Sequence, residues 1–317
     1  MLFWVLGYIS AQARIGHVVS AAQSEGRPGG GGMLSAETEA YIGSPVADKA
    51  CGACLAAAGK FIEDEKLAAL RERTKDMSYL PAGSYQVGSP EGSGEPDEHP
   101  KRQIRLDAFY MEKHEVTIAD YMKFAAVAGE NYPEWAKPAG KFNIDTGNEP
   151  YYGRLSALLK NCSNCPVIGV TQKDAEAYCA SKKRRLPTEA EWEAAARGGA
   201  ASAFSFGEDM GQAGDYAWIE TNSGGEPHPV GMKKPNKYGL YDMHGNVWEM
   251  VADYYDAQAY SNGGGGDPQG PAGRENVIRG GSWAFEAAAM RSANRASTYK
   301  ANDDIGFRCA VSAISVQ

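Results

Sequence analysis

Oxygen-bearing side chains cluster within one apolar stretch of the chain, between Gly239 and Asp253. Asn246 and Glu249 stand three residues apart, next to Gly245, which favours a sharp backbone bend. A bend in a buried segment leaves carbonyl groups that need new partners. Amide, carboxylate and carbonyl oxygens are the donors that a hard cation such as Ca²⁺ prefers. The alternative is a capped turn, in which Asn246 and Glu249 only bind backbone amides.

Cysteine is the second residue type that carries chemistry, and the chain contains six: Cys51, Cys54, Cys162, Cys165, Cys179 and Cys309. The first four form two C-x-x-C pairs. Two such pairs can build a four-cysteine zinc site, but these lie far apart and lack a zinc-ribbon context. We favour the alternative, disulfides in a secreted protein. The expected location is therefore periplasmic or extracellular.

The composition is that of a soluble globular protein, with 43% hydrophobic and 23% charged residues in a chain of 317. The net charge of −8 and the lack of a Lys/Arg stripe argue against a nucleic-acid partner. The only basic run, Lys182 to Arg185, is expected to be a solvated helix end. No apolar run reaches the roughly 18 residues of a membrane-spanning helix, so we expect none.

Three segments differ in character. Residues 1–34 end in four glycines and are expected to be a signal, a linker or disordered. Residues 35–76 are expected to form a small helical segment, and strands begin at Met77. Three later helices should each start at a Thr that is followed three residues on by a carboxylate, the pattern of an N-terminal cap. These pairs are Thr117 and Asp120, Thr171 and Asp174, and Thr188 and Glu191.

The second half of the sequence has a different pattern from the first. After Gly198 it predicts short strands and Gly-rich loops, with no further long helix. The expected fold class is therefore α+β, with short helices first and an irregular β-rich half that carries the polar clusters.

Five blocks, in this order, give the chain a specific resemblance. It resembles the formylglycine-generating enzyme (sulfatase-modifying factor) family in Arg185–Gly199, His228–Gly231, Tyr238–Glu249, Arg279–Trp283 and Gly306–Cys309. The resemblance implies one domain over residues 77–317. Its fold would be the family's irregular variant of the C-type lectin-like fold, with little regular secondary structure.

The resemblance also assigns roles to individual residues. Cys179 and Cys309 match positions that the family commonly joins by a disulfide. Asn246, the carbonyl of Val247, and Glu249 match the family's calcium-binding turn. A structural Ca²⁺ is therefore expected there.

The resemblance breaks down after the Gly-Gly-Ser-aromatic block. The family's enzymes carry two cysteines there, which bind Cu(I) and activate oxygen to oxidise a substrate cysteine. Here Phe285 stands at the first of these positions, and the second falls in a run of alanines. Cu(I) needs thiolate or thioether ligands, and Met290 alone is a poor substitute. We therefore expect neither a copper site nor the family's oxidase activity.

A family cleft is implied along the segments around Trp218, Ser282–Glu286 and Arg291–Tyr299. The polar groups able to converge there are Glu286, Arg291, Arg295 and His244. Glu286 is a weak candidate for a general base. Arg291 and Arg295 either recognise an anionic or peptide ligand or form structural ion pairs with Asp303 or Glu286.

These observations favour an exported protein that binds a protein, peptide or small-molecule ligand in the cleft. The alternative is a diverged oxidoreductase or maturation enzyme acting on a peptide-derived substrate, like the cysteine-less relatives implicated in pyoverdine siderophore maturation. A variable ligand-binding protein of the diversity-generating retroelement type ranks last, because Glu286 and Met290 cannot arise from adenine-mutated AAC codons.

Overall fold

The computed structural model describes residues 66–262 and 275–313. The chain divides into two units, Met1–Lys66 and Leu67–Gln317, and the elements described below belong to the second. Of the proposed helical segment 35–76, only the end is described, and residues 67–74 of it are helical. Cys51 and Cys54 lie outside the described residues, so their pairing stays a prediction.

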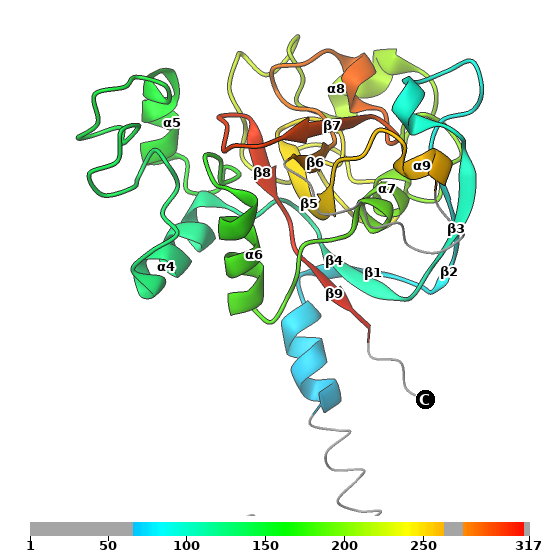
Figure 1. Ribbon diagram of the computed structural model, residues 1–317, viewed down its shortest axis with the longest axis horizontal. Coiled ribbons are helices and arrows are strands. Elements are labelled where there is room, and N and C mark those ends of the chain that lie inside the picture. Colours follow the sequence, from blue (N-terminus) through cyan, green and yellow to red (C-terminus); the bar gives the residue numbers. More distant parts are fainter. Residues whose placement is uncertain (1–65, 263–274, 314–317) are drawn as a thin grey trace, which may run out of the picture. The chain divides into compact units, whose positions relative to one another are not determined.

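The strands form three small sheets (Figure 1). Their orders are β1-β4-β9, β2-β3 and β7-β6-β5-β8, and only the pair β5 and β8 is parallel. The strands are β1 (Met77–Leu80), β2 (Gly83–Val87), β3 (Arg102–Leu106), β4 (Phe109–Glu112), β5 (Trp248–Tyr254), β6 (Asn276–Arg279), β7 (Arg295–Thr298), β8 (Ile305–Phe307) and β9 (Ala310–Ser312).

The helices are short, and the three predicted Thr caps are confirmed. The side chains of Thr117, Thr171 and Thr188 accept hydrogen bonds from the amides of Asp120, Asp174 and Glu191. The helices are α4 (Ile118–Ala128), α5 (Ser156–Asn161), α6 (Gln172–Ser181), α7 (Glu189–Arg197), α8 (Ala213–Tyr216) and α9 (Ala259–Asn262), with 3-10 turns η1 (Pro96–Glu98), η2 (Gly153–Leu155), η3 (Met210–Gln212) and η4 (Ala287–Met290).

Helix α7 is buried along its whole length and lies between β2 and the sheet that contains β5 and β6. Its Trp192 is fully buried in one of the two large hydrophobic clusters. The other large cluster joins α4 and α6 to β5 and β8. Buried carboxylates on α7 are paired with arginines from elsewhere, such as Glu193 with Arg279 at 2.6 Å. The core thus contains ion pairs as well as apolar side chains.

A disulfide joins Cys179 on α6 to Cys309, which lies between β8 and β9. Both cysteines are fully buried. This is the pair that the family resemblance implies, and it closes a loop with a sequence separation of 130.

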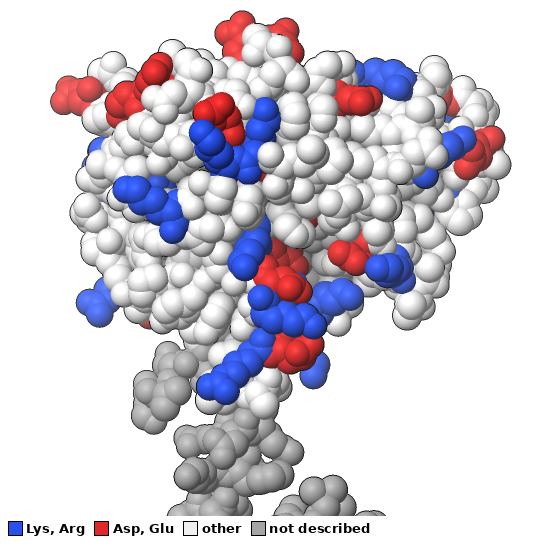
Figure 2. All heavy atoms as spheres, turned by 180° about the vertical axis from the view of Figure 1, so that it is seen from behind, with Lys and Arg blue, Asp and Glu red and all other residues white. Residues whose placement is uncertain are grey.

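Short helices and small sheets with long connections confirm the predicted mixed α+β class. On the face shown in Figure 2, acidic side chains lie between the basic ones where these gather, and much of the face is uncharged. The basic run is less solvated than predicted, because Arg184 pairs with Glu112 and Arg185 pairs with Glu191. The described residues contain no helix long and apolar enough to cross a membrane.

Candidate functional site

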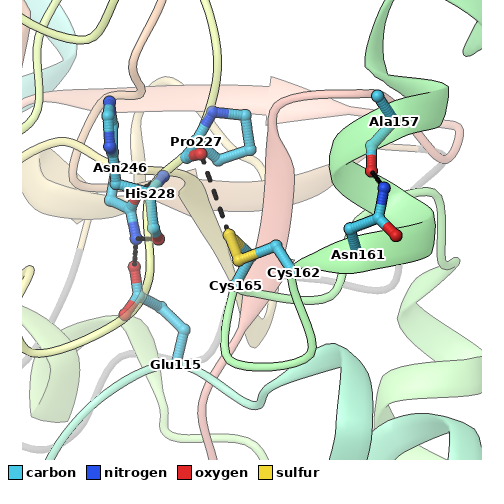
Figure 3. Close-up of a disulfide and its surroundings, with 8 residues drawn as sticks. All are labelled: Glu115, Ala157, Asn161, Cys162, Cys165, Pro227, His228 and Asn246. Atoms are coloured by element: carbon cyan, nitrogen blue, oxygen red, sulfur yellow. Dashed lines mark hydrogen bonds between the residues drawn. A yellow bond between two sulfur atoms is a disulfide. The ribbon is translucent and has the colours of Figure 1, made fainter.

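The predicted backbone bend occurs at Gly245 and Asn246, which both adopt positive φ angles of 83° and 61°. A Cβ atom on Gly245 would lie 2.3 Å from the carbonyl oxygen of Trp218, so only glycine fits there. The amide side chain of Asn246 accepts from the backbone N–H of His228 at 2.9 Å and donates to Glu115 at 3.0 Å. Figure 3 shows Asn246 between His228 and Glu115.

Glu249 is fully engaged by protein donors. One carboxylate oxygen accepts from the Trp192 indole at 2.8 Å and from Arg308 Nε at 2.7 Å, and the other accepts from Arg308 Nη2 at 2.6 Å. The side-chain oxygens of Asn246 and Glu249 therefore accept from different partners. A cation bound at Glu249 would have to displace Arg308. This arrangement does not fit the calcium site implied for Asn246, Val247 and Glu249. Calcium at this turn stays a prediction.

A second carboxyl group reaches Glu115 beneath the same bend. The carboxyls of Glu115 and Asp242 interact electrostatically, and both residues are buried. Glu115 Oε2 and Asp242 Oδ1 have no hydrogen-bond partner among the described residues, so a second negative charge in this buried pair is costly. Burial and the neighbouring carboxylates of Asp242 and Glu249 raise the pKa of Glu115 well above its ordinary value, whereas Arg308 opposes this shift.

We expect Glu115→Gln to become more stable relative to the wild type as pH rises above about 4.5. The folded wild type binds a proton there that the unfolded chain has lost, so its stability falls by up to about 1.4 kcal/mol per pH unit until the pKa of the folded state is reached. Glutamine imitates the protonated acid and has no such slope.

Urea unfolding of both proteins between pH 5 and pH 9 measures this difference. Asp242→Asn serves as the matched variant, because it removes the neighbouring carboxylate that helps to raise the Glu115 pKa. Parallel stability profiles for Glu115→Gln and the wild type would show that Glu115 binds no proton in the folded state over this pH range.

His244 does not face a cleft, although we expected it to reach one. It is buried, and its ring accepts from the Ser205 amide at 3.2 Å while the other ring nitrogen binds the Met290 carbonyl at 2.7 Å. Burial lowers its pKa to about 4, so the ring is neutral. His244 therefore holds the loop at Ser205 against the end of η4.

The two candidate arginines are structural, but their partners differ from those expected. Arg291 pairs with Glu98 at 2.6 Å, and Arg295 makes two hydrogen bonds of 2.7 and 2.9 Å to Glu189. Asp303 instead pairs with Arg154 at 2.5 Å. Both partners of the candidate arginines come from segments about a hundred or more residues earlier in the chain, which spacing alone does not reveal.

The last candidate, Glu286, is exposed and lies just before η4, with no side-chain capping bond. No described histidine, cysteine or carboxylate group of three or more could hold a metal ion. Three members of the predicted set, Arg291, Arg295 and His244, are therefore held in structural contacts, and Glu286 is the only exposed member.

Phe285 and Met290 occupy the segment where the family's enzymes hold their copper cysteines. Phe285 is 42% exposed and packs edge-on against Trp248 at a ring-centroid distance of 5.6 Å. Met290 is fully buried, and a Cβ on Gly281 would meet its sulfur at 2.2 Å. One side chain is thus on the surface and the other in the core, and the segment presents no pair of soft ligands.

The segment Trp283–Glu286 contacts residues from two other segments that carry charged side chains. The backbone N–H of Glu220 donates to the Phe285 carbonyl at 3.0 Å, and Glu286 follows in the chain. The guanidinium of Arg154 lies 4.6 Å from the ring centroid of buried Trp283. We call Arg154, Glu220, Phe285 and Glu286 the Phe285 surface. The sequence did not point to Arg154 or Glu220, because each comes from a separate loop with no motif of its own.

The disulfide Cys162–Cys165 lies beside Pro227, next to His228 (Figure 3). This bond rules out the zinc alternative for this pair, because both thiols are used within the motif. The Cys165 sulfur lies 3.9 Å from the Pro227 carbonyl oxygen, and the Val230 amide donates to the Asn164 carbonyl at 3.0 Å. The ring thus supports the loop that contains His228.

The family model for the sulfatase-modifying factor enzyme 1-like domain matches residues 64–313, and the chain belongs to this family. Relatives include the formylglycine-generating enzyme of Mus musculus, 32% identical over 74% of each chain. The inactive C-alpha-formylglycine-generating enzyme 2 of the same species is 29% identical over 75% of this chain and 86% of its own.

A third relative is the serine/threonine-protein kinase pkn1 of Chlamydia caviae, which is 33% identical over 79% of this chain. The chain spans only 40% of the length of that protein. The kinase activity in its name is therefore not carried over to this chain.

Solved structures of similar fold include Treponema denticola variable protein 1 and PvdO from Pseudomonas aeruginosa. Both superpose with a TM-score of 0.60, at 26% and 29% identity, and cover 75% and 76% of this chain and 95% and 97% of their own. These neighbours confirm the predicted irregular, C-type lectin-like variant of the family fold.

Proposed function

We propose that this chain is an exported member of the family that binds a protein, a peptide or a small ligand through the Phe285 surface, without copper oxidase chemistry. The observation that carries the proposal is the exposed aromatic ring of Phe285 at the position of the family's first copper-binding cysteine. Exposed aromatic side chains that rest on a rigid core are frequent anchors of protein interfaces. The two disulfides favour an oxidising compartment.

The charged rim supports recognition of a polar or peptide ligand. Glu286 follows Phe285 in the chain, and Arg154 contacts Trp283, two residues before Phe285. The Arg154 side chain is 53% exposed although it pairs with Asp303. Such a rim orients a partner and favours one charge pattern over others. The name of the inactive mouse relative is consistent with a family member that has lost catalysis.

A peptide-display selection against the full chain tests the proposal. We expect Phe285→Ala to lower the affinity for the selected peptides at least tenfold, because an aromatic anchor supplies a large share of the binding energy. Tyr79→Ala is the matched control, since Tyr79 is a 52% exposed aromatic residue on β1, outside the Phe285 surface and the implied cleft. Peptides that bind both variants as tightly as the wild type would contradict this surface assignment.

Two measurements address the alternative function, a diverged oxidoreductase. Metal analysis of the purified protein should find no copper, and a cysteine-containing peptide incubated with Cu(I) and oxygen should yield no aldehyde. Bound redox metal or an aldehyde product would overturn the non-catalytic proposal.

A further inference from the structure

A wide, open surface cavity of about 850 Å³ lies between η1 and α9, which are in contact with each other. Figure 1 shows α9 beside the turn that contains η1. The volume is within the range of small-molecule sites. The cavity shares no lining residue with the Phe285 surface, and its polar lining residues include Glu95, Asp97, His99, Tyr255, Gln258 and Arg295.

The floor of the cavity is fixed by internal bonds. Arg295 binds both carboxylate oxygens of Glu189 and donates to the backbone carbonyls of Asp97 and Asp256. The Tyr255 hydroxyl donates to the Asp97 carboxylate at 2.7 Å. The guanidinium is buried and its charge is already matched by Glu189, so it attracts an anion only weakly. These bonds hold the floor in place before any ligand arrives.

The wall of the cavity, by contrast, carries polar groups that bind nothing among the described residues. The side chains of Glu95, His99 and Gln258 have no partner there. Asp97 has one cation near its carboxylate, Arg295 at 3.7 Å, which is shared with Glu189. The lining therefore has an excess of carboxylate over cationic charge. No described group of three or more histidine, cysteine or carboxylate side chains could hold a metal ion.

We propose that this cavity binds an alkylammonium group, as carried by a polyamine or by a lysine side chain. The carboxylates of Glu95 and Asp97 accept hydrogen bonds from the ammonium, and such charge-assisted bonds are the stronger kind. The Gln258 carbonyl and a neutral His99 supply further acceptors. The site is separate from the proposed ligand surface at Phe285, and either can be wrong without the other.

Titration calorimetry of the full chain at low salt tests the proposal, with 1,4-diaminobutane and Nα-acetyl-lysine methylamide as probes. We expect one bound diamine per chain, and no heat from 1,4-butanediol, which is similar in length but uncharged. Binding of the lysine compound as well assigns the site to peptide side chains, whereas binding of the diamine alone assigns it to polyamines.

Three variants locate the binding. Glu95→Gln and Asp97→Asn should each weaken diamine binding at least tenfold. Glu91→Gln should leave it unchanged, because Glu91 is an exposed carboxylate of the same loop that does not line the cavity. Glu95 is exposed and is not needed for folding, so that variant remains informative if Asp97→Asn is unstable. Absence of diamine binding, equal binding of butanediol, or unchanged affinity in Glu95→Gln would overturn the proposal.

Discussion

Arg308→Met is expected to destabilise the protein by about 3–5 kcal/mol, or to prevent folding, because it removes the cation from a buried group of carboxyls. Arg308 is fully buried and binds both oxygens of Glu249. It also donates to the backbone carbonyls of Glu112 and Tyr241. Without it, the Glu249 carboxylate loses the cation that binds both of its oxygens, while the acidic pair Glu115 and Asp242 loses its nearby cation.

The free energy of unfolding in urea measures the effect, since native proteins have only about 5–15 kcal/mol in total. Lys234→Met is the matched control, because Lys234 pairs with Asp215 at 2.7 Å with both side chains 61% exposed, and exposed pairs contribute little. The double variant Arg308→Met with Glu249→Gln should recover part of the loss, because it removes the stranded charge. A loss no larger than that of the control would show that Glu249 is solvated or neutral in the folded protein.

Replacing Cys179 and Cys309 together by serine is expected to cost about 4–5 kcal/mol. A crosslink with a sequence separation of 130 greatly restricts the unfolded chain, and chain-entropy models give a value of this size. Both cysteines are buried, so the serine hydroxyls also lose hydrogen bonds to water.

The second disulfide provides the comparison. Cys162 and Cys165 have a sequence separation of only 3. The double serine variant of this pair should therefore lower the free energy of unfolding much less, by about 2 kcal/mol or below. Urea unfolding without reductant compares the two variants with the wild type. Equal losses for both pairs would contradict a stabilisation that depends on loop length.

Local features of the fold could be predicted from the sequence. The helix starts at Thr117, Thr171 and Thr188 follow from a side chain and an amide three residues apart, which are bound by local geometry. The bend at Gly245 and Asn246 follows from residue types that tolerate positive φ. The disulfide between Cys179 and Cys309 required more than local pattern, and came from the family resemblance.

Which polar side chains meet was decided only by the tertiary structure. The family resemblance implies a calcium role for Glu249, and the partners of its carboxylate in the structure, Arg308 and Trp192, come from segments far away in the chain. Arg291 and Arg295 stand four residues apart, yet their carboxylate partners, Glu98 in η1 and Glu189 at the start of α7, come from segments far apart in the chain. A buried charge must be paired with an opposite charge. Which residue supplies that charge depends on the chain topology and not on the spacing of residues in the sequence. The sequence therefore determined that the family's two copper-binding cysteines are replaced. Only the structure showed that Phe285 lies on the surface and Met290 in the core.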